Sequence, residues 1–396
     1  MEIGDVLFNA AAFLAGLSLL ERGARLFVSS ATTLADRLHL PEMLVGILIA
    51  GAEWEELAVV TLSLAQRRPA LAVGNIIGSS IANIFGAFAL GLIFSTRNWD
   101  GFDQGSKAAC LGLLGLTTFV SLFALADILW YRVVAVILLS GFVVYILFVL
   151  WSIWRAMSEA KKDDDHHHHN PVEDVESGPV HDHLDDDAAS INCSASSRSS
   201  SDGHAEDANE STSLLKKRRV SRLKNLRHSI LPACQLLGSF VALALSGFIL
   251  SHTSALLAAS FDMSDSAFGA TILSLATTLP EKFLAVTSGS QGHSGLLVAD
   301  AVGSNVFLLT LCLGIAAWSI AGHQWHDHPE DGLRSFVDVS RIEAWWMWAS
   351  AIALTAVVFI GSKDVFKVTG VRQMLGALLL MAYGGFLAVE FTVLRD

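Results

Sequence analysis

Charged residues are scarce in this chain of 396 residues. Only 16% are Asp, Glu, Lys or Arg, 53% are hydrophobic, and the mean hydropathy is +0.51. Because a soluble globular domain carries about a quarter charged residues, this composition argues against a soluble enzyme. A membrane helix needs about 20 apolar residues, and the sequence supplies that length many times. We therefore expect an all-α membrane protein that is not an enzyme.

Cysteine is scarce too, and nucleotide-binding motifs are missing. The four cysteines (Cys110, Cys193, Cys234 and Cys312) show no spacing typical of a disulfide framework or a metal site. No phosphate-loop motif is visible, so we expect neither direct ATP drive nor a resident cofactor. No basic region precedes the first apolar segment, which continues past Glu21. This pattern favours a first membrane helix over a cleaved signal peptide.

Hydropathy predicts about ten membrane spans in two groups of five. Residues 1–154 would form the first five-helix repeat and residues 230–396 the second, with a polar loop at 155–229 between them. Many of the chain's charged residues lie in that loop, and the formal net charge of the whole chain is −12. The approximate limits of the spans are 6–28, 42–66, 71–94, 108–127, 131–154, 230–251, 266–289, 295–320, 343–361 and 370–391.

The polar insert is rich in His, Asp and Ser, a composition that cannot bury enough apolar surface to fold alone. We expect a disordered loop, and its many Lys and Arg residues place it in the cytoplasm. His166–His169 with His181 and His183 could bind Zn²⁺ or another divalent metal, or could belong to a solvated linker. The segment Glu210–Leu215 matches an acidic dileucine sorting signal, a short pattern that also occurs by chance. It would imply a sorting adaptor as partner and a eukaryotic vacuolar or endolysosomal membrane; the plasma membrane is the alternative.

The two halves of the chain contain an internal repeat. One ungapped offset of 225 residues aligns Glu56 with Glu281 and Ser79 with Ser304. The aligned segments are 46–60 with 271–285, and 73–86 with 298–311. Weak internal symmetry of this kind is typical of transporter folds. Because five spans per half is an odd number, the halves must run in opposite directions, which predicts two inverted five-helix repeats.

Glu56 and Glu281 are candidate cation ligands. A carboxylate at bilayer depth is costly unless it is paired, hydrated or bound to a cation. The alternative is a salt bridge to a neighbouring helix, for which the available cations are Arg22, Arg25, Arg132 and Lys282. Neutral oxygen donors, which suit hard cations, lie on the same segments: Ser79, Ser80, Asn83, Thr277, Thr278, Ser304 and Asn305. Such residues also join membrane helices without binding ions, so the hydroxyls could serve either in ion binding or in helix packing.

Two further carboxylates extend this set. Glu53 lies three residues before Glu56, on nearly the same helix face. Because carboxylates this close repel each other, one of them binds a proton more readily, and the pair is a candidate proton acceptor. Asp300 lies one turn before Ser304, where it could add negative charge to the site or cap the start of a helix.

Three motifs carry a family resemblance. Residues Ala276–Glu281 resemble the signature G-T-S-L-P-E, and Gly74–Asn83 and Gly303–Phe307 resemble G-N-x-x-G-S-N-x-x-N/D. With the five-plus-five layout, the chain resembles the cation/calcium antiporter superfamily, which includes the sodium/calcium and calcium/proton exchangers. The resemblance implies ten helices in an inverted repeat and an ion site formed by the second, third, seventh and eighth spans. It also implies alternating access, in which the first and sixth spans slide against a fixed core.

The resemblance assigns roles to individual residues. Glu56 and Glu281 would be the central carboxylate ligands and Asn83 the amide ligand, while Ser79, Ser304, Thr277 and Thr278 would line the counter-ion positions. Two departures affect this mapping. Leu308 stands where the family has Asp or Asn, so one oxygen ligand is missing. Residues 52–55 (Ala-Glu-Trp-Glu) replace T-S-L-P, which removes two hydroxyls and keeps H⁺ open as an alternative to Na⁺.

We therefore predict a secondary-active antiporter that exchanges Ca²⁺, or a related divalent cation, for Na⁺ or H⁺. A divalent-cation channel would share the carboxylates but would not need two bistable halves. A non-transporting, metal-sensing membrane protein is the third reading, because Leu308 removes a ligand. The expected partners are the lipid bilayer and the transported cations, and no nucleic acid.

Overall fold

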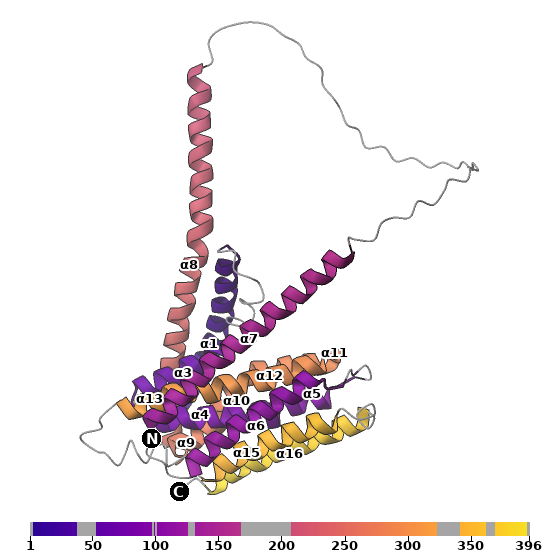
Figure 1. The fold of residues 1–396 in the computed structure, drawn as a ribbon. Helices are drawn as coiled ribbons and strands as arrows, with labels where there is room; N and C mark the ends of the chain where they lie inside the picture. The colour runs from indigo at the N-terminus through magenta and orange to yellow at the C-terminus, as the bar shows by residue number, and fades with distance from the viewer. Residues whose placement is uncertain are drawn as a thin grey trace, which may run out of the picture. The chain divides into compact units, whose positions relative to one another are not determined.

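The computed structural model describes residues 3–37, 53–96, 99, 101–125, 131–167, 207–322, 341–361 and 369–393. These residues form helices and short connections without any β-strand (Figure 1). Eight of the described helices are long and apolar enough to cross a membrane. The prediction of an all-α membrane protein is therefore confirmed.

The first half of the chain begins with α1 (Ile3–Arg37) and a short α3 (Trp54–Ala65). A third segment consists of α4 (Pro69–Ile81), the π-helix η2 (Ala82–Phe88) and α5 (Ala89–Ile93). It is followed by α6 (Gln104–Leu125) and α7 (Tyr131–His167). This half therefore has helix on each of its five predicted spans.

The second half begins with α8 (Asp207–Ser260). A broken segment follows: α9 (Asp265–Phe268), η3 (Gly269–Leu273), α10 (Ser274–Thr277) and α11 (Leu279–Gln291). The remaining elements are α12 (Ser294–Phe307), η4 (Leu308–Cys312), α13 (Leu313–Gly322), α15 (Arg341–Ile360) and α16 (Thr369–Val393). Helix again covers every predicted span.

One predicted span is not a continuous helix, and another lies only partly within the described residues. The described part of the second span is α3, which has only 12 residues. The seventh breaks at Thr278, because Pro280 lacks an N–H and disfavours helical geometry in the residue before it. The count of ten and the inverted arrangement therefore stay predictions, although all ten segments are helical.

The polar insert matches a separate part of the structure. The chain forms two compact units, one of residues 1–150 with 232–396 and the other of 151–231. Helix extends into both ends of the predicted loop, since α7 continues to His167 and α8 begins at Asp207. Residues 168–206, which include His181 and His183, lie outside the described part of the chain.

The third and eighth predicted spans form the interior of the larger unit. In the most apolar window of residues 69–93, 89% of positions are buried, and the value for 294–322 is 72%. For α1 and α7 only 22% and 17% are buried. The segments α4–η2–α5 and α12–η4–α13 are therefore central, while α1 and α7 present apolar faces to lipid.

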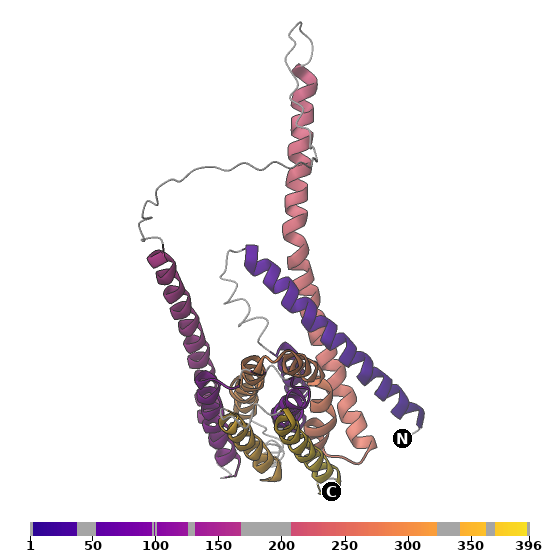
Figure 2. The ribbon, with the colours of Figure 1, turned by 90° about the vertical axis from the view of Figure 1, so that its right-hand side faces the viewer.

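Helix α1 packs against the membrane part of α8, as both views show (Figures 1 and 2). A Cβ at Gly16 would lie 3.0 Å from the Ile249 side chain, and one at Gly23 would lie 3.3 Å from the Leu243 backbone nitrogen. Small residues allow such close approach of membrane helices. Phe13 and Leu20 of α1 belong to a hydrophobic cluster separate from the main core. That second cluster also contains Val59 of α3, Leu71 of α4 and Phe268 of α9, so it joins the α1–α8 pair to the central segments.

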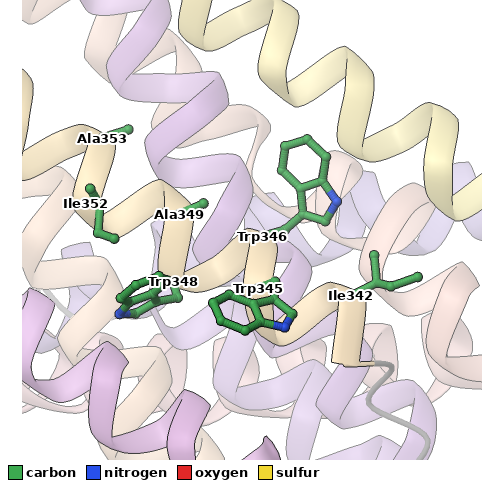
Figure 3. Close-up of a pocket in the computed structure, with 7 residues that line it drawn as sticks. All are labelled: Ile342, Trp345, Trp346, Trp348, Ala349, Ile352 and Ala353. Atoms are coloured by element: carbon green, nitrogen blue, oxygen red, sulfur yellow. The ribbon is translucent and has the colours of Figure 1, made fainter.

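Three tryptophans mark the start of α15 (Figure 3). Trp345 is exposed and lines an apolar groove with Trp346 and Trp348. Tryptophan is enriched at membrane–water interfaces, which places this end of α15 near a headgroup region. Trp346 also packs edge-on against Phe85 of η2, with ring centroids 6.3 Å apart. Trp346 therefore also packs against the central segment α4–η2–α5.

Helix α4 contacts the broken seventh segment backbone to backbone. A Cβ added at Gly74 would lie 2.3 Å from the Ser266 carbonyl oxygen, and one at Gly78 would lie 2.2 Å from that of Ala270. Real Cβ atoms essentially never approach within 3.0 Å. Only glycine therefore allows these two segments to pack this closely.

We expect Gly78→Ala to destabilise the protein, because the opposing atom belongs to the backbone and cannot move aside. Overpacking of this kind costs about 1–3 kcal/mol. Thermal unfolding in detergent should show a lower midpoint for Gly78→Ala than for the wild type. Gly112→Ala on α6 is the matched control, since no atom lies within 4 Å of its added Cβ. Equal midpoints for the two variants would contradict this account of the packing.

Candidate functional site

Glu56 and Glu281 occupy equivalent positions in two short helices. Each is the third residue of its helix, α3 or α11, directly after a break at Glu53 or Thr278. The same 225-residue offset relates the neighbouring helices, because Ser79 and Ser304 are each the eleventh residue of α4 or α12. The sequence repeat therefore extends to the helix boundaries, and both glutamates lie at helix breaks, where membrane transporters bind ions.

Hydrogen bonds from both halves of the chain hold the carboxylate of Glu56. Its side chain is buried, with 2% exposure. Oε1 accepts hydrogen bonds from Ser79 Oγ at 2.8 Å and from Thr277 Oγ1 at 2.7 Å, and Oε2 accepts one from Asn75 Nδ2. Arg25, a possible salt-bridge partner, pairs with Glu21 at 3.0 Å instead. Three neutral donors thus replace the salt bridge considered from the sequence.

Several buried polar atoms on the segments that carry Glu56, Ser79 and Glu281 lack a hydrogen-bond partner among the described residues. They are both amide atoms of Asn83, Ser80 Oγ, Asn75 Oδ1, both carboxylate oxygens of Glu53 and Glu281 Oε2. Buried polar groups are nearly always hydrogen-bonded, so such a concentration requires an explanation. All of these atoms except the Asn83 nitrogen are oxygens that a hard cation could bind.

Glu53 and Asp300 add negative charge to the same region. The electrostatic neighbours of Glu53 are Glu281, Glu56, Asp300 and the Ser304 hydroxyl. Asp300 also acts on Glu281. It lies inside α12, which begins at Ser294, so the alternative that Asp300 caps a helix start is wrong. Asp300 therefore contributes a carboxyl group near Glu53 and Glu281 and is not a helix cap.

Other predicted site residues make local contacts. Asn305 Nδ2 donates to the Ala301 carbonyl at 2.7 Å, and Thr278 Oγ1 donates to the Ser274 carbonyl at 2.6 Å. Leu308, at the position equivalent to Asn83, is fully buried in the main core. In the described part of the chain no three His, Cys, Asp or Glu side chains form a metal-binding group. Any ion here would depend on amides and hydroxyls as well as carboxylates.

The sequence interpretation missed the π-helices. Asn83 lies in η2, and the equivalent Leu308 begins η4. π-Helices are rare and often mark functional sites. Periodicity alone gives no signal for them, because one inserted residue shifts a helical face without changing its composition.

A cavity of about 140 Å³ reaches the site from one side. Its walls come from α1, α3, α10 and α11, and include Glu21, Glu55, Thr277 and Pro280. Since Thr277 also donates to Glu56, a single side chain separates this cavity from the buried carboxylate. The cavity lies where α1 meets α3, α10 and α11.

Comparison with known families identifies the class of this protein. The family model for sodium/calcium exchanger proteins matches residues 8–151 and 231–392. The chain therefore belongs to the sodium/calcium exchanger protein family, whose members are membrane transporters. The match omits the polar insert and covers both helical halves.

Individual relatives agree with this assignment. The chain is 26% identical over 385 residues to CaxA of Alkalimonas amylolytica, which is assigned as an antiporter; the match covers 96% of this chain and 97% of CaxA. It is 35% identical over 78 residues to the sodium/calcium exchanger MaX1 of Methanosarcina acetivorans, covering 19% of this chain and 22% of MaX1. These relatives are bacterial and archaeal, so they do not support the expected eukaryotic endomembrane location.

Solved structures share the fold. Native YfkE superposes with a TM-score of 0.56 at 13% identity, covering 97% of this chain and 92% of YfkE. The sodium-calcium exchanger NCX_Mj gives a TM-score of 0.51 at 17% identity, with coverage of 97% and 99%. At these identities the likeness establishes the fold alone.

We expect Thr277→Val to lower stability because it removes a hydrogen bond to a buried carboxylate at nearly constant volume. Hydrogen bonds to charged groups contribute about 1.5–3 kcal/mol. The matched control is Thr271→Val, since the Thr271 hydroxyl is equally buried but donates only to the Ala267 carbonyl of its own segment. Thermal unfolding in detergent should show the larger loss for Thr277→Val. A larger loss for Thr271→Val would mean that the bond to Glu56 contributes little.

Proposed function

We propose that this protein is a secondary-active antiporter that exchanges Ca²⁺, or a related divalent cation, for Na⁺ or H⁺. The observation that carries the proposal is the set of buried carboxylate, amide and hydroxyl oxygens on the segments of Glu56 and Glu281, several of which have no hydrogen-bond partner among the described residues. Carboxylate, amide and hydroxyl oxygens are the ligands that hard divalent cations prefer. Family membership supports antiport as the mode of transport.

The residues divide into three roles under this proposal. Glu56 and Glu281 bind the divalent cation from the two halves, and Asn83 adds an amide oxygen. Ser79, Thr277 and Asn75 hold Glu56 in place between transport events through the hydrogen bonds already described. Glu53 and Asp300 are further carboxyl groups beside these ligands.

Alternating access would use the α1–α8 pair as its moving part. This pair lies outside the main core, in a hydrophobic cluster that it shares with α3, α4 and α9, and α1 lines the cavity that reaches Thr277. Sliding of the pair would close this cavity and open a path on the opposite side. A burial of 98% for Glu56 supports a carrier over a channel, because a channel needs a continuous water-filled path past its ligands.

Uptake of radioactive Ca²⁺ into proteoliposomes tests the exchange directly. Vesicles loaded with Na⁺, vesicles with an acid interior and vesicles without any gradient should be compared. We expect uptake only with an opposing gradient, and loss of at least about tenfold in Glu281→Gln, because a charged ligand is removed. The control is Glu390→Gln, a buried carboxylate on α16, a helix that contributes no site residue.

Each outcome of this experiment decides between the candidate functions. Uptake that proceeds equally without an opposing gradient would indicate a channel. Absence of flux with Ca²⁺, Mg²⁺, Mn²⁺ and Zn²⁺ would overturn transport, and metal binding without flux would favour a sensor. Equal loss in Glu281→Gln and Glu390→Gln would show that neutralising any buried carboxylate has this effect.

The unequal pair Asn83 and Leu308 provides a second test. We expect Asn83→Leu to weaken divalent-cation binding by about tenfold or more, because it removes an amide oxygen that no described residue satisfies. Leu308→Asn adds the corresponding amide in the second half and should tighten binding if it folds. Half-saturation of uptake measures both effects. Unchanged half-saturation in Asn83→Leu would remove Asn83 from the site.

A further inference from the structure

Lys282 is a buried cation inside the carboxylate cluster, and the proposed exchange mechanism has not used it. Its side chain is 9% exposed. Nζ donates to the Thr278 carbonyl oxygen at 3.2 Å and to Thr278 Oγ1 at 2.5 Å. Glu281 and Glu56 are its electrostatic neighbours. The ammonium group therefore has two neutral oxygens and two carboxylates around it, a set that would equally suit a monovalent cation.

The first half provides a space for this side chain. A Cβ at Gly86 of η2 would lie 3.2 Å from Lys282 Cε and 3.9 Å from Nζ. At the equivalent positions of the repeat, Leu57 replaces Lys282 and Leu311 replaces Gly86. Both leucines pack against the main hydrophobic core. The pair Lys282 and Gly86 therefore corresponds, across the repeat, to the apolar pair Leu57 and Leu311, and each pair takes one residue from each half.

A purely structural role for the lysine explains these contacts less well. If Lys282 served only to stabilise α11, an apolar residue would serve better, because burying an ionised group costs free energy. The equivalent Leu57 shows that the fold accepts an apolar side chain at this position. The ammonium is instead held at the helix break, where it donates to the same Thr278 carbonyl oxygen that accepts the Lys282 backbone N–H.

We propose that the ammonium group of Lys282 occupies the monovalent-cation position at Thr278, so that this protein exchanges divalent cations without binding Na⁺ there. The proposal rests on the proposed function, since it specifies the coupling of the same site. An ammonium and Na⁺ carry the same charge and bind the same oxygens. A tethered ammonium stays in the protein, so Na⁺ can neither compete for the position nor be required at it.

The first test compares Na⁺ with choline, using the full chain in proteoliposomes. Wild-type uptake of divalent cations under a pH gradient should be the same in NaCl and in choline chloride. Uptake that requires Na⁺ would overturn the Lys282 proposal and leave the exchange function standing. Absence of uptake with every divalent cation and gradient would instead count against the exchange function.

The second test restores the missing cation from solution. Lys282→Ala removes the ammonium and its stem, and we expect uptake to fall by about tenfold in choline chloride, as for loss of one charged contact. Na⁺ or methylammonium, which fit the vacated space, should restore most of it. Lys282→Met is the matched control, because it removes the charge but fills the space, so neither ion should restore its uptake. Leu57→Ala, at the equivalent position, should respond to neither ion.

A stability measurement tests the same position when transport is lost. In detergent, NaCl should raise the thermal midpoint of Lys282→Ala relative to choline chloride, because a ligand that binds only the folded state stabilises it. The wild type and Lys282→Met should show no such difference. If Lys282→Ala gains nothing from Na⁺ in either uptake or thermal midpoint, the ammonium does not occupy a cation position.

Discussion

The placement of one carboxylate, that of Glu56, constrains much of this structure. A buried carboxylate must receive hydrogen bonds or a counter-charge, and here the donors come from α4 and from α10. Ser79 and Thr277 reach the same oxygen only because α4 lies against the seventh segment at backbone distance. Gly78, next to Ser79, permits that distance. Glu56 therefore receives its hydrogen bonds from both halves only when the two halves pack closely.

The helix breaks serve the same requirement. Glu56 and Glu281 each lie in the first turn of a helix, α3 or α11, that follows a non-helical residue, Glu53 or Thr278. The π-helix η2 places Asn83 in the buried core without a protein partner. Interrupted helices and unsatisfied oxygens coincide in space, and a bound cation would satisfy both.

The sequence alone predicts the helical spans, the repeat and the pairing of Glu56 with Glu281, because hydropathy and internal similarity are recorded directly in residue order. It does not predict the π-helices, since a single inserted residue leaves composition unchanged. The role of Asp300 required the true start of α12 at Ser294. Lys282 was considered only as a salt-bridge partner, because its contact with Thr278 depends on the helix break and on the space beside Gly86.

The two halves share a framework but differ in charge. The first half has Glu53 and Asn83 where the second has Thr278 and Leu308, and it has Leu57 where the second has Lys282. Each of these three differences removes cation-binding capacity from the second half or adds it to the first, whereas Asp300 at the position of Asn75 adds a carboxyl group to the second. Because the helix boundaries still match, these substitutions changed the ligands without changing the scaffold. A repeat fold can thus keep the symmetry that alternating access requires while divalent-cation ligands concentrate in one half and a fixed positive charge in the other.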